Sequence, residues 1–402
     1  MNEDQQTSGF SRDPTGAGAI DLVRPVTALD AGEDPAVLSP FSLMVRRFNR
    51  HRVGVIALYV QLVLFTLAAF CEFLAPTTRE WGDLQFSYCP PQVLQFSIQD
   101  GFFVGGLLRV DNPVTFARNY VPVPENRVPL GFFVEGEPYQ LWGLIPLKRH
   151  FFGIDHAKYA AHVPNAKEQS PSFYLLGADK YGRDIFSRLI YGTRISLSVG
   201  LIAIAIMFVL GITIGAISGY AGGWIDMLIQ RLMEIIGALP QLPLWLALGA
   251  VIPPEWSPLT AYFCVTLVLS LLGWTGLARE VRGKILALRE EDYAVAARLI
   301  GASHTRILFR HLVPGFASHI IVVLTLTVPG MILGETALSF LGLGLRPPIV
   351  SWGVLLQDCM SLQAISNYPW LLSPVLFIIL TILAFNFFGD ALRDAADPYA
   401  DR

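Results

Sequence analysis

The sequence predicts an all-α integral membrane protein with six membrane-spanning helices and a large insert between the first two. Of its 402 residues, 53% are apolar and only 15% are charged. Apolar runs of about 20 residues recur, and each is long enough to cross a hydrocarbon core. Arginines gather at 46–52 and again at 279–315. Basic residues favour cytoplasmic links, so both segments are expected on the cytoplasmic side.

The N-terminal part divides into a tail and a first span. Residues 1–40 are polar, acidic and rich in Gly, Pro, Asp and Thr, and we expect a disordered cytosolic tail. The segment 41–76 follows, with its basic cluster and a first span at 53–75. This apolar run begins too late and is too long for a cleavable signal peptide. The basic cluster predicts that the N terminus lies inside.

The loop after the first span, residues 77–193, is too long to lack structure. Its aromatic and β-branched patches at 95–98 and 101–104 are broken by Gly and Pro. This pattern is typical of short strands. We therefore expect a small outer subdomain of mixed or β character.

The end of this loop is more helical in pattern. Apolar residues recur at helical spacing after Asp184, interleaved with Arg188 and preceded by Arg183, and Arg194 follows. The pattern predicts an interfacial amphipathic helix whose arginines face lipid headgroups. Asp184 is its expected N-cap.

The core, residues 194–392, is expected to hold the other five spans. They are predicted at 195–219, 225–251, 259–278, 316–340 and 369–388. An even number of spans returns the C terminus to the cytosol, where residues 393–402 form a tail. The same parity places 279–315 inside, as the charge rule independently requires. In the outer link 341–368, Trp352 and Trp370 are expected in the headgroup layer.

The cytosolic link 279–315 is the most informative segment. Ala296, Ala297, Gly301 and Ala302 are small and closely spaced, and small residues let a helix approach another surface tightly. Gly301 is expected to end a first short helix, and Pro314 marks the next break. The layout predicts a folded element that another protein can grip. On pattern alone, an ordinary amphipathic surface helix explains it equally well.

Broken helices and a buried acid point to a pathway through the membrane. Pro240 and Pro243 interrupt the third span and Pro329 interrupts the fifth, and broken helices expose backbone only towards protein or a wet cavity. Glu335 lies late in the fifth span. Intramembrane carboxylates face the bundle interior or a water-filled path. Glu335 is therefore either part of an outer gate or peptide contact, or a buried acid bonded to a neighbouring helix.

Other chemistries find little support. The net charge of −3 gives no indication of nucleic acid binding, and Gly283-Lys284 lacks the frame of a phosphate loop. No nucleophile, base or metal cluster is evident, and no metal site is predicted. The four cysteines lack C-x-x-C spacing. Cys89 and Cys359 would both lie outside, so they are either disulfide-bonded or unpaired.

Several motifs resemble one known family. They are 177–184 (GADKYGRD), 219–226 (GYAGGWID), 292–314 with its small residues, 339–344 (SFLGLG) followed by Pro347-Pro348 and 351–353 (SWG), and 385–394 (FNFFGDALRD). Each motif is weak alone, but their order over residues 172–398 is specific. The chain resembles the C-type oligopeptide/dipeptide permeases of ABC importers, in the binding-protein-dependent transport system permease (MetI-like) family. Its long first loop resembles that of the Yej-type relatives.

The resemblance implies a type I ABC importer permease fold in a bacterial inner membrane, multi-pass with both termini cytoplasmic. It implies a non-catalytic subunit that works with a B-type permease, two ABC ATPase subunits or domains, a periplasmic solute-binding protein, membrane lipid and a peptide substrate. No cofactor is expected on this chain, because ATP and Mg belong to the partner subunits. The implied ATPase-coupling residues are Tyr293, Ala296, Ala297, Gly301, Ala302, Ser303, His311 and Pro314. Val295 and Val313 depart from the Glu and Leu usual in the family.

Alternatives within transport are a nickel, opine or peptide-antibiotic importer. From another class, an ion-driven secondary transporter would need mid-span charges and usually internal repeats. Only Glu335 fits the first requirement, and no internal sequence repeat is evident.

Overall fold

The computed structural model describes residues 40–98, 101–111, 113, 118–162, 171–253 and 255–396. The predicted tail 1–40 lies almost entirely outside these residues, as does the end of the predicted C-terminal tail. Among these described residues, five helices are long and apolar enough to cross a membrane, and a bent helix pair makes a sixth crossing when it is counted as one span. They are α2 (Arg52–Ala69), α5 (Ile185–Ala221), the pair α6 (Gly223–Ala238) and α7 (Gln241–Ala250), α8 (Pro258–Leu288), α11 (Ala317–Phe340) and α14 (Ser373–Ala396).

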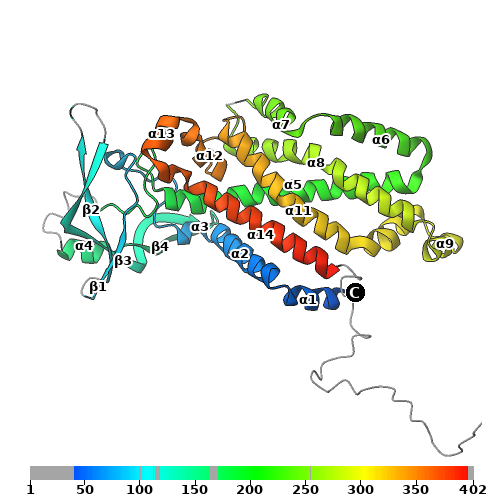
Figure 1. The fold of residues 1–402 in the computed structure, drawn as a ribbon, viewed down its shortest axis with the longest axis horizontal. Helices are drawn as coiled ribbons and strands as arrows, with labels where there is room; N and C mark the ends of the chain where they lie inside the picture. The colour runs from blue at the N-terminus through cyan, green and yellow to red at the C-terminus, as the bar shows by residue number, and fades with distance from the viewer. Residues whose placement is uncertain are drawn as a thin grey trace, which may run out of the picture. The chain divides into compact units, whose positions relative to one another are not determined.

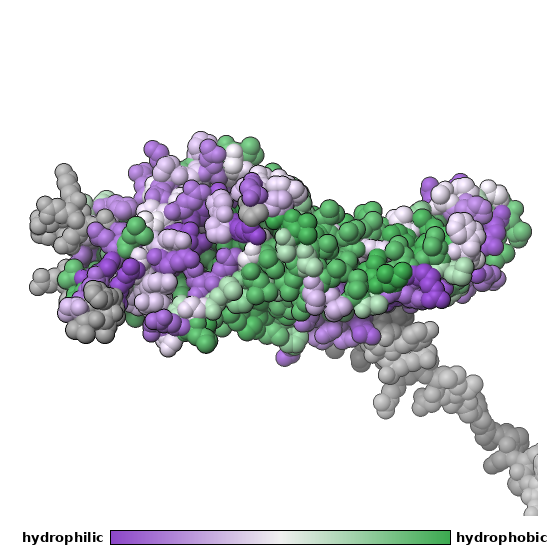
Figure 2. Space-filling model, turned by 90° about the horizontal axis from the view of Figure 1, so that it is seen from above, coloured by the Kyte–Doolittle hydropathy of each residue, from purple (hydrophilic) through white to green (hydrophobic). Residues whose placement is uncertain are grey.

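Short elements connect these helices. They are α1 (Pro40–Arg50), α3 (Cys71–Leu74), α4 (His156–His162), α9 (Asp292–Leu299), α10 (His304–Arg306), α12 (Trp352–Leu356) and α13 (Leu362–Asn367). The long helices pack side by side, with α5 along α8 and α14 between α2 and α11 (Figure 1). On the face shown in Figure 2, hydrophobic side chains predominate over the helical body, while hydrophilic ones gather at the sheet end and at the opposite end, where α9 lies. This distribution fits a multi-pass membrane protein.

The close contact of α5 with α8 depends on glycines at every fourth position. A Cβ on Gly211 would lie 2.8 Å from Leu277, and one on Gly215 would overlap the carbonyl oxygen of Ala278. Gly219 continues the row, because its Cβ would lie 2.8 Å from the carbonyl oxygen of Arg282. Only glycines allow two backbones this near to each other. The two helices are thereby held together along the C-terminal half of each.

The insert contains an antiparallel four-stranded sheet in the order β1-β2-β3-β4. Its strands are β1 (Leu94–Ser97), β2 (Gly101–Asp111), β3 (Arg118–Leu141) and β4 (Ile145–Ile154). The β character predicted for this loop is therefore observed. The sheet rests against the outer ends of the first helices, because His150 on β4 hydrogen-bonds the carbonyl oxygen of Ala75 through Nδ1 at 2.6 Å. β4 also contacts α3 (Figure 1).

The predicted interfacial helix before the second span is wrong. Residues 185–221 form one continuous helix, α5, whose first turns are buried. Arg188 is 4% exposed and forms an ion pair with Asp179, which also pairs with Arg183 at 2.7 Å. Arg194 pairs with Glu72 of α3. These arginines therefore bind carboxylates of the protein, so they do not form the free cationic face that an interfacial helix requires.

The N-cap predicted for this helix is confirmed. Asp184 accepts hydrogen bonds from the backbone N–H groups of Phe186, at 3.2 Å, and Ser187, at 2.8 Å. Burial raises the pKa of Asp184 to about 6.

Trp352 does not lie in the headgroup layer where it was expected. It is fully buried and donates its Nε1–H to the carbonyl oxygen of Leu189 at 3.3 Å. The described cysteines are free thiols, so Cys89 and Cys359 are not bonded to each other.

Candidate functional site

The segment 279–315, predicted to be cytosolic, is folded into successive helical elements. The fourth span continues as α8 to Leu288, beyond the predicted end at 278, and α9 begins at Asp292. Gly301 has a φ of +82°. Its N–H bonds the carbonyl oxygen of Arg298, and the N–H of Ala302 bonds that of Ala297, both at 3.1 Å. This pair of bonds is the Schellman motif that ends a helix at a glycine.

The chain then runs directly into the fifth span. α10, a π-helical turn (Ile307–Leu312) and a 3-10 turn (Val313–Phe316) follow one another without a loop, and α11 begins at Ala317. Pro314 lies in the 3-10 turn. A displacement of α9 would therefore be passed to α8 on one side and to α11 on the other.

One face of α9 is packed inward. Ala294 is fully buried and Ala297 is 7% exposed. Both belong to a hydrophobic cluster with Ile285 of α8, Ile307 and Leu312. The small alanines let α9 lie close against these larger side chains. This face anchors the segment to the bundle.

The opposite face presents large apolar side chains to solvent. Leu299 is 83% exposed and Ile300 is 86% exposed. Val295 and Tyr293 are also exposed. Exposed apolar side chains that form a contiguous patch are typical of interaction sites. We call Val295, Leu299 and Ile300 the outward face of α9.

The predicted coupling residues divide between the two faces. Ala296, Gly301, Ser303 and Pro314 are exposed, as is Tyr293, whereas Ala302 and His311 are half-buried and Ala297 packs inward. The sequence prediction named neither Leu299 nor Ile300. The sequence did contain a signal for this surface: two adjacent aliphatic residues stand directly before the glycine that ends the helix, within a basic link.

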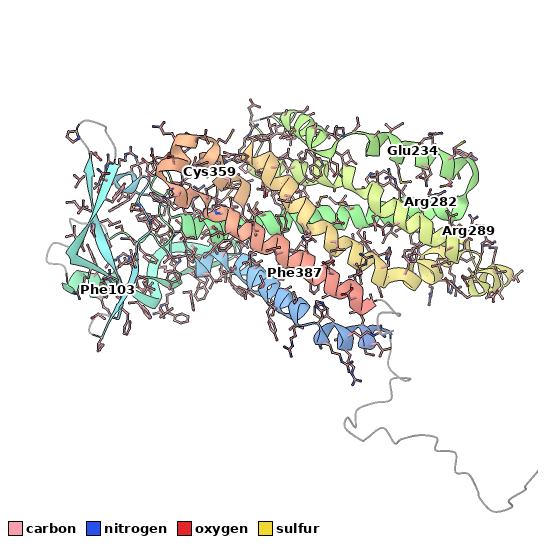
Figure 3. The ribbon with its side chains drawn as sticks, viewed as in Figure 1. Phe103, Glu234, Arg282, Arg289, Cys359 and Phe387 are labelled. Atoms are coloured by element: carbon pink, nitrogen blue, oxygen red, sulfur yellow. The ribbon has the colours of Figure 1, made fainter. Side chains whose placement is uncertain are left out.

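Several of the basic residues predicted for this link hold the bundle together. Arg282 bonds Asp226 through Nε and Nη2, both at 2.7 Å, and Ser218 donates to the same carboxylate at 2.5 Å. Arg289 donates to the carbonyl oxygen of Gly219 at 3.0 Å. Arg282 and Arg289 lie along the far half of α8, opposite the end of the helix near the sheet (Figure 3). These bonds connect the turn between α5 and α6 to α8.

A further contact connects the segment after Gly301 to the bundle. The Tyr220 hydroxyl lies 2.9 Å from Nδ1 of His304. His319 pairs with Glu280 at 2.8 Å between Nε2 and Oε2. Within the described ranges, no group of three or more His, Cys, Asp or Glu residues is placed to hold a metal ion.

The third span is broken as its prolines predicted. α6 and α7 meet at an 84° bend. Pro240 is the N-cap of α7 and Pro243 lies in its first turn, and both are exposed. α7 packs against α11, where a Cβ on Gly334 would lie 2.8 Å from the Trp245 ring. The bend therefore lies beside the helix that carries Glu335.

Glu335 is fully buried and is the centre of a hydroxyl network. Ser339 donates to Oε1 at 2.8 Å and Ser196 donates to Oε2 at 3.2 Å. Ser196 Oγ also accepts the N–H of Trp352 at 3.1 Å, at the start of α12. The carboxyl group therefore joins α11 to α5 and to the outer link. Pro329, inside α11, is also buried.

Comparison with known proteins gives a consistent result. Residues 211–402 match the model of the binding-protein-dependent transport system inner membrane component, and residues 39–91 match the N-terminal TM domain of oligopeptide transport permease C. The oligopeptide transport system permease protein OppC of Bacillus subtilis is 39% identical over 58% of this chain and 74% of its own length.

Other relatives agree with this match. The dipeptide transport system permease protein DppC of Alkalihalophilus pseudofirmus is 42% identical over 61% of this chain and 79% of its own length. A crystal structure of an amino acid ABC transporter with histidines aligns with 52% of this chain and 92% of its own, at 17% identity and a TM-score of 0.38. That overlap is too loose to support an argument about the fold.

Proposed function

Because the chain belongs to the family of inner-membrane permeases of binding-protein-dependent transport systems, we propose that it is a permease subunit of an ATP-driven importer of di- or oligopeptides. It forms the translocation pathway with a second, B-type permease, and a periplasmic solute-binding protein delivers the peptide. Two ATPase subunits or domains bind ATP and Mg²⁺ and supply the energy. Relatives named for oligopeptide and dipeptide transport support the peptide substrate.

The outward face of α9 carries the coupling proposal. Leu299 and Ile300 are almost fully exposed at the tip of a segment whose other face is anchored in the bundle. Burying one such side chain contributes about 1.5–3 kcal/mol. In this proposal they enter a groove on an ATPase subunit, and α8 and α11 transmit its movement to the membrane.

The pathway proposal rests on the outer network. Outward opening would have to separate α11 from α5 and α12, which the hydroxyl bonds of Glu335 join. In this proposal the bonds of Glu335 hold the outer gate closed. The bend at Pro240 and Pro243, and Pro329 within α11, let the neighbouring helices move when the gate opens. A ligand that binds the open state alone would shift this equilibrium.

One pair of variants tests the coupling role. Ile300→Glu introduces a charge into the proposed docking face without touching the core, so ATPase subunits should no longer co-purify and peptide uptake should fall at least tenfold. The matched control is Leu362→Glu on α13, where the native side chain is 85% exposed, compared with 86% for Ile300. The control should retain both properties. Unchanged co-purification and uptake in the Ile300 variant would remove α9 from the coupling interface.

The substrate class needs a separate measurement. In the assembled complex with its solute-binding protein, peptide should stimulate ATP hydrolysis and nickel should not. Stimulation by nickel alone would assign the chain to a metal importer. Uptake that survives ATP depletion but stops when the proton gradient is dissipated would instead identify an ion-driven transporter.

A further inference from the structure

The turn between β3 and β4 exposes an unusual apolar surface. Trp142 is 51% exposed, Leu144 is 80% exposed and Ile145 is 46% exposed. Residues 138–147 contain no charged side chain. We call residues 141–147 the hairpin tip. An extramembrane sheet gains nothing from such a tip in water, so a partner surface is implied.

The hairpin tip is fastened to the end of the first span. Trp142 donates its Nε1–H to the carbonyl oxygen of Ala69, the last residue of α2, at 2.7 Å. Its ring lies 5.7 Å from the ring of Phe70, between centroids. Close by, Phe133 on β3 lies 6.1 Å from Phe73 on α3. The hairpin tip therefore lies at the level where α2 ends.

It also lies on the exposed side of α2. Ile56, Tyr59 and Val63 are exposed at helical spacing and form one outward stripe. Phe70 comes two turns after Val63, so it continues this stripe. α2 has 18 residues and is therefore about 27 Å long, close to the thickness of a hydrocarbon core of about 30 Å. Trp142, whose ring lies beside that of Phe70, extends the stripe at the end of α2.

The backbone of the turn is held in a costly conformation. Trp142 has a φ of +55° and Gly143 has a φ of +72°, and the N–H of Leu144 bonds the carbonyl oxygen of Leu141 at 3.0 Å. Glycine accepts the left-handed region freely, but a bulky residue there is strained by about 1–2 kcal/mol. Asn and Gly are the usual residues of such a turn. The contact of the Trp142 ring with Phe70 gives a reason for a tryptophan at this strained position.

We propose that the hairpin tip is a second membrane contact, which dips into the outer leaflet of the bilayer beside α2. The apolar side chains of Leu144 and Ile145 enter the acyl chains, and Trp142 occupies the interface that tryptophan favours. Lys148 and Arg149 follow on β4, both exposed. At about 3.4 Å per strand residue, Lys148 lies roughly 14 Å along the strand from Leu144. The two cations then meet the phosphate groups of the lipid.

The proposal accounts for where the outer subdomain meets lipid. The arginines expected to face headgroups, Arg188 and Arg194, bind Asp179 and Glu72 instead. An apolar hairpin tip followed by cations supplies the same kind of contact from the sheet. Because its position depends only on the hairpin and α2, it does not depend on which substrate the permease carries.

A depth measurement tests the proposal. In the full chain reconstituted into phosphatidylethanolamine/phosphatidylglycerol vesicles, Leu144→Cys is labelled with bimane and compared with Val93→Cys, which replaces a 74% exposed residue before β1. Lipids brominated along the acyl chain should quench the label at 144 severalfold more than the label at 93. Iodide in the outer water should quench the label at 93 more strongly. The unmodified chain measures background labelling of the native cysteines.

Two outcomes would overturn it. If the label at 144 is as open to iodide as the label at 93, the hairpin tip lies in water. If it is open to iodide in the permease alone but becomes protected on adding the solute-binding protein, the surface belongs to that protein partner. To separate folding from insertion, circular dichroism should match between the two labelled variants. A variant with an altered spectrum is replaced by the same label at Ile145.

Discussion

At the scale of single residues, Gly182 allows two backbone segments of the insert to lie in direct contact. Gly182 has a φ of +70°, and a Cβ there would overlap the carbonyl oxygen of Asp83. Its own carbonyl oxygen accepts the N–H of Asp83 at 3.1 Å and the hydroxyl of Tyr174 at 3.0 Å. The GRD part of the 177–184 motif therefore begins with a residue that has no room for a side chain, directly before the Asp184 helix cap.

Gly182→Ala should consequently be more damaging than an ordinary glycine substitution. Gly342→Ala is the matched control, because Gly342 has a φ of +75° but open space where a Cβ would go. The stability of the control should fall only by the cost of the left-handed conformation, about 1–2 kcal/mol. The stability of Gly182→Ala should fall by clearly more, because the backbone at Asp83 must also shift to make room for the Cβ. Thermal unfolding of both variants in detergent measures this, and equal losses would mean that Asp83 moves aside at no cost.

At the scale of elements, an ion pair helps to hold the turn between α5 and α6, together with the bond from Arg289 to the carbonyl oxygen of Gly219. The carboxylate of Asp226 receives two bonds from Arg282 of α8 and one from Ser218. The exposed pair Arg231–Glu234, 2.7 Å apart on α6, joins only residues of the same helix. The Asp226–Arg282 pair therefore joins α6 to α8, whereas the Arg231–Glu234 pair joins no two elements.

Substitution of each pair should therefore have different effects. Asp226→Asn removes charge-assisted bonds worth about 1.5–3 kcal/mol in partly buried settings, so amide hydrogen exchange at 219–226 should accelerate. Arg231→Gln breaks a pair whose side chains are 74% and 57% exposed, and such pairs contribute about 0–1 kcal/mol. Its exchange pattern should match that of the unmodified chain. Equal exchange in the two variants would show that the turn does not need the Asp226–Arg282 pair.

At the scale of the whole molecule, six crossings, with the α6–α7 pair counted as one, would place α9 and the links 252–257 and 341–368 on opposite sides of the membrane. The charge pattern predicts that α9 lies in the cytosol. Leu299→Cys and Leu362→Cys replace residues of nearly equal exposure, 83% and 85%. A membrane-impermeant maleimide should label position 299 only in inside-out vesicles and position 362 only in right-side-out ones. The reverse pattern would invert the topology and remove α9 from the reach of any cytosolic ATPase.

The candidate site was predicted in part. Gly301 ends α9 as its position among small residues indicated, because helix termination by glycine is a local property. The division of the segment into an anchored face and an outward face was not predicted. Ala297 and Leu299 both fit a helix, and only the position of α8 decides that Ala297 turns inward and Leu299 remains exposed.

The sequence by itself determined the spans and the family motifs, and it predicted the sidedness of the links. These depend on hydropathy summed over about 20 residues and on charge next to the membrane, and both are properties of contiguous chain. Only the tertiary structure decided the partner of each charge and the surface left uncovered. Arg194 appeared free to meet lipid until the fold brought Glu72 to it across 122 residues. No sequence pattern pointed to Trp142, whose contact with Ala69 exists only in the folded chain. Pairings of this kind depend on contacts between distant segments, which no local pattern encodes.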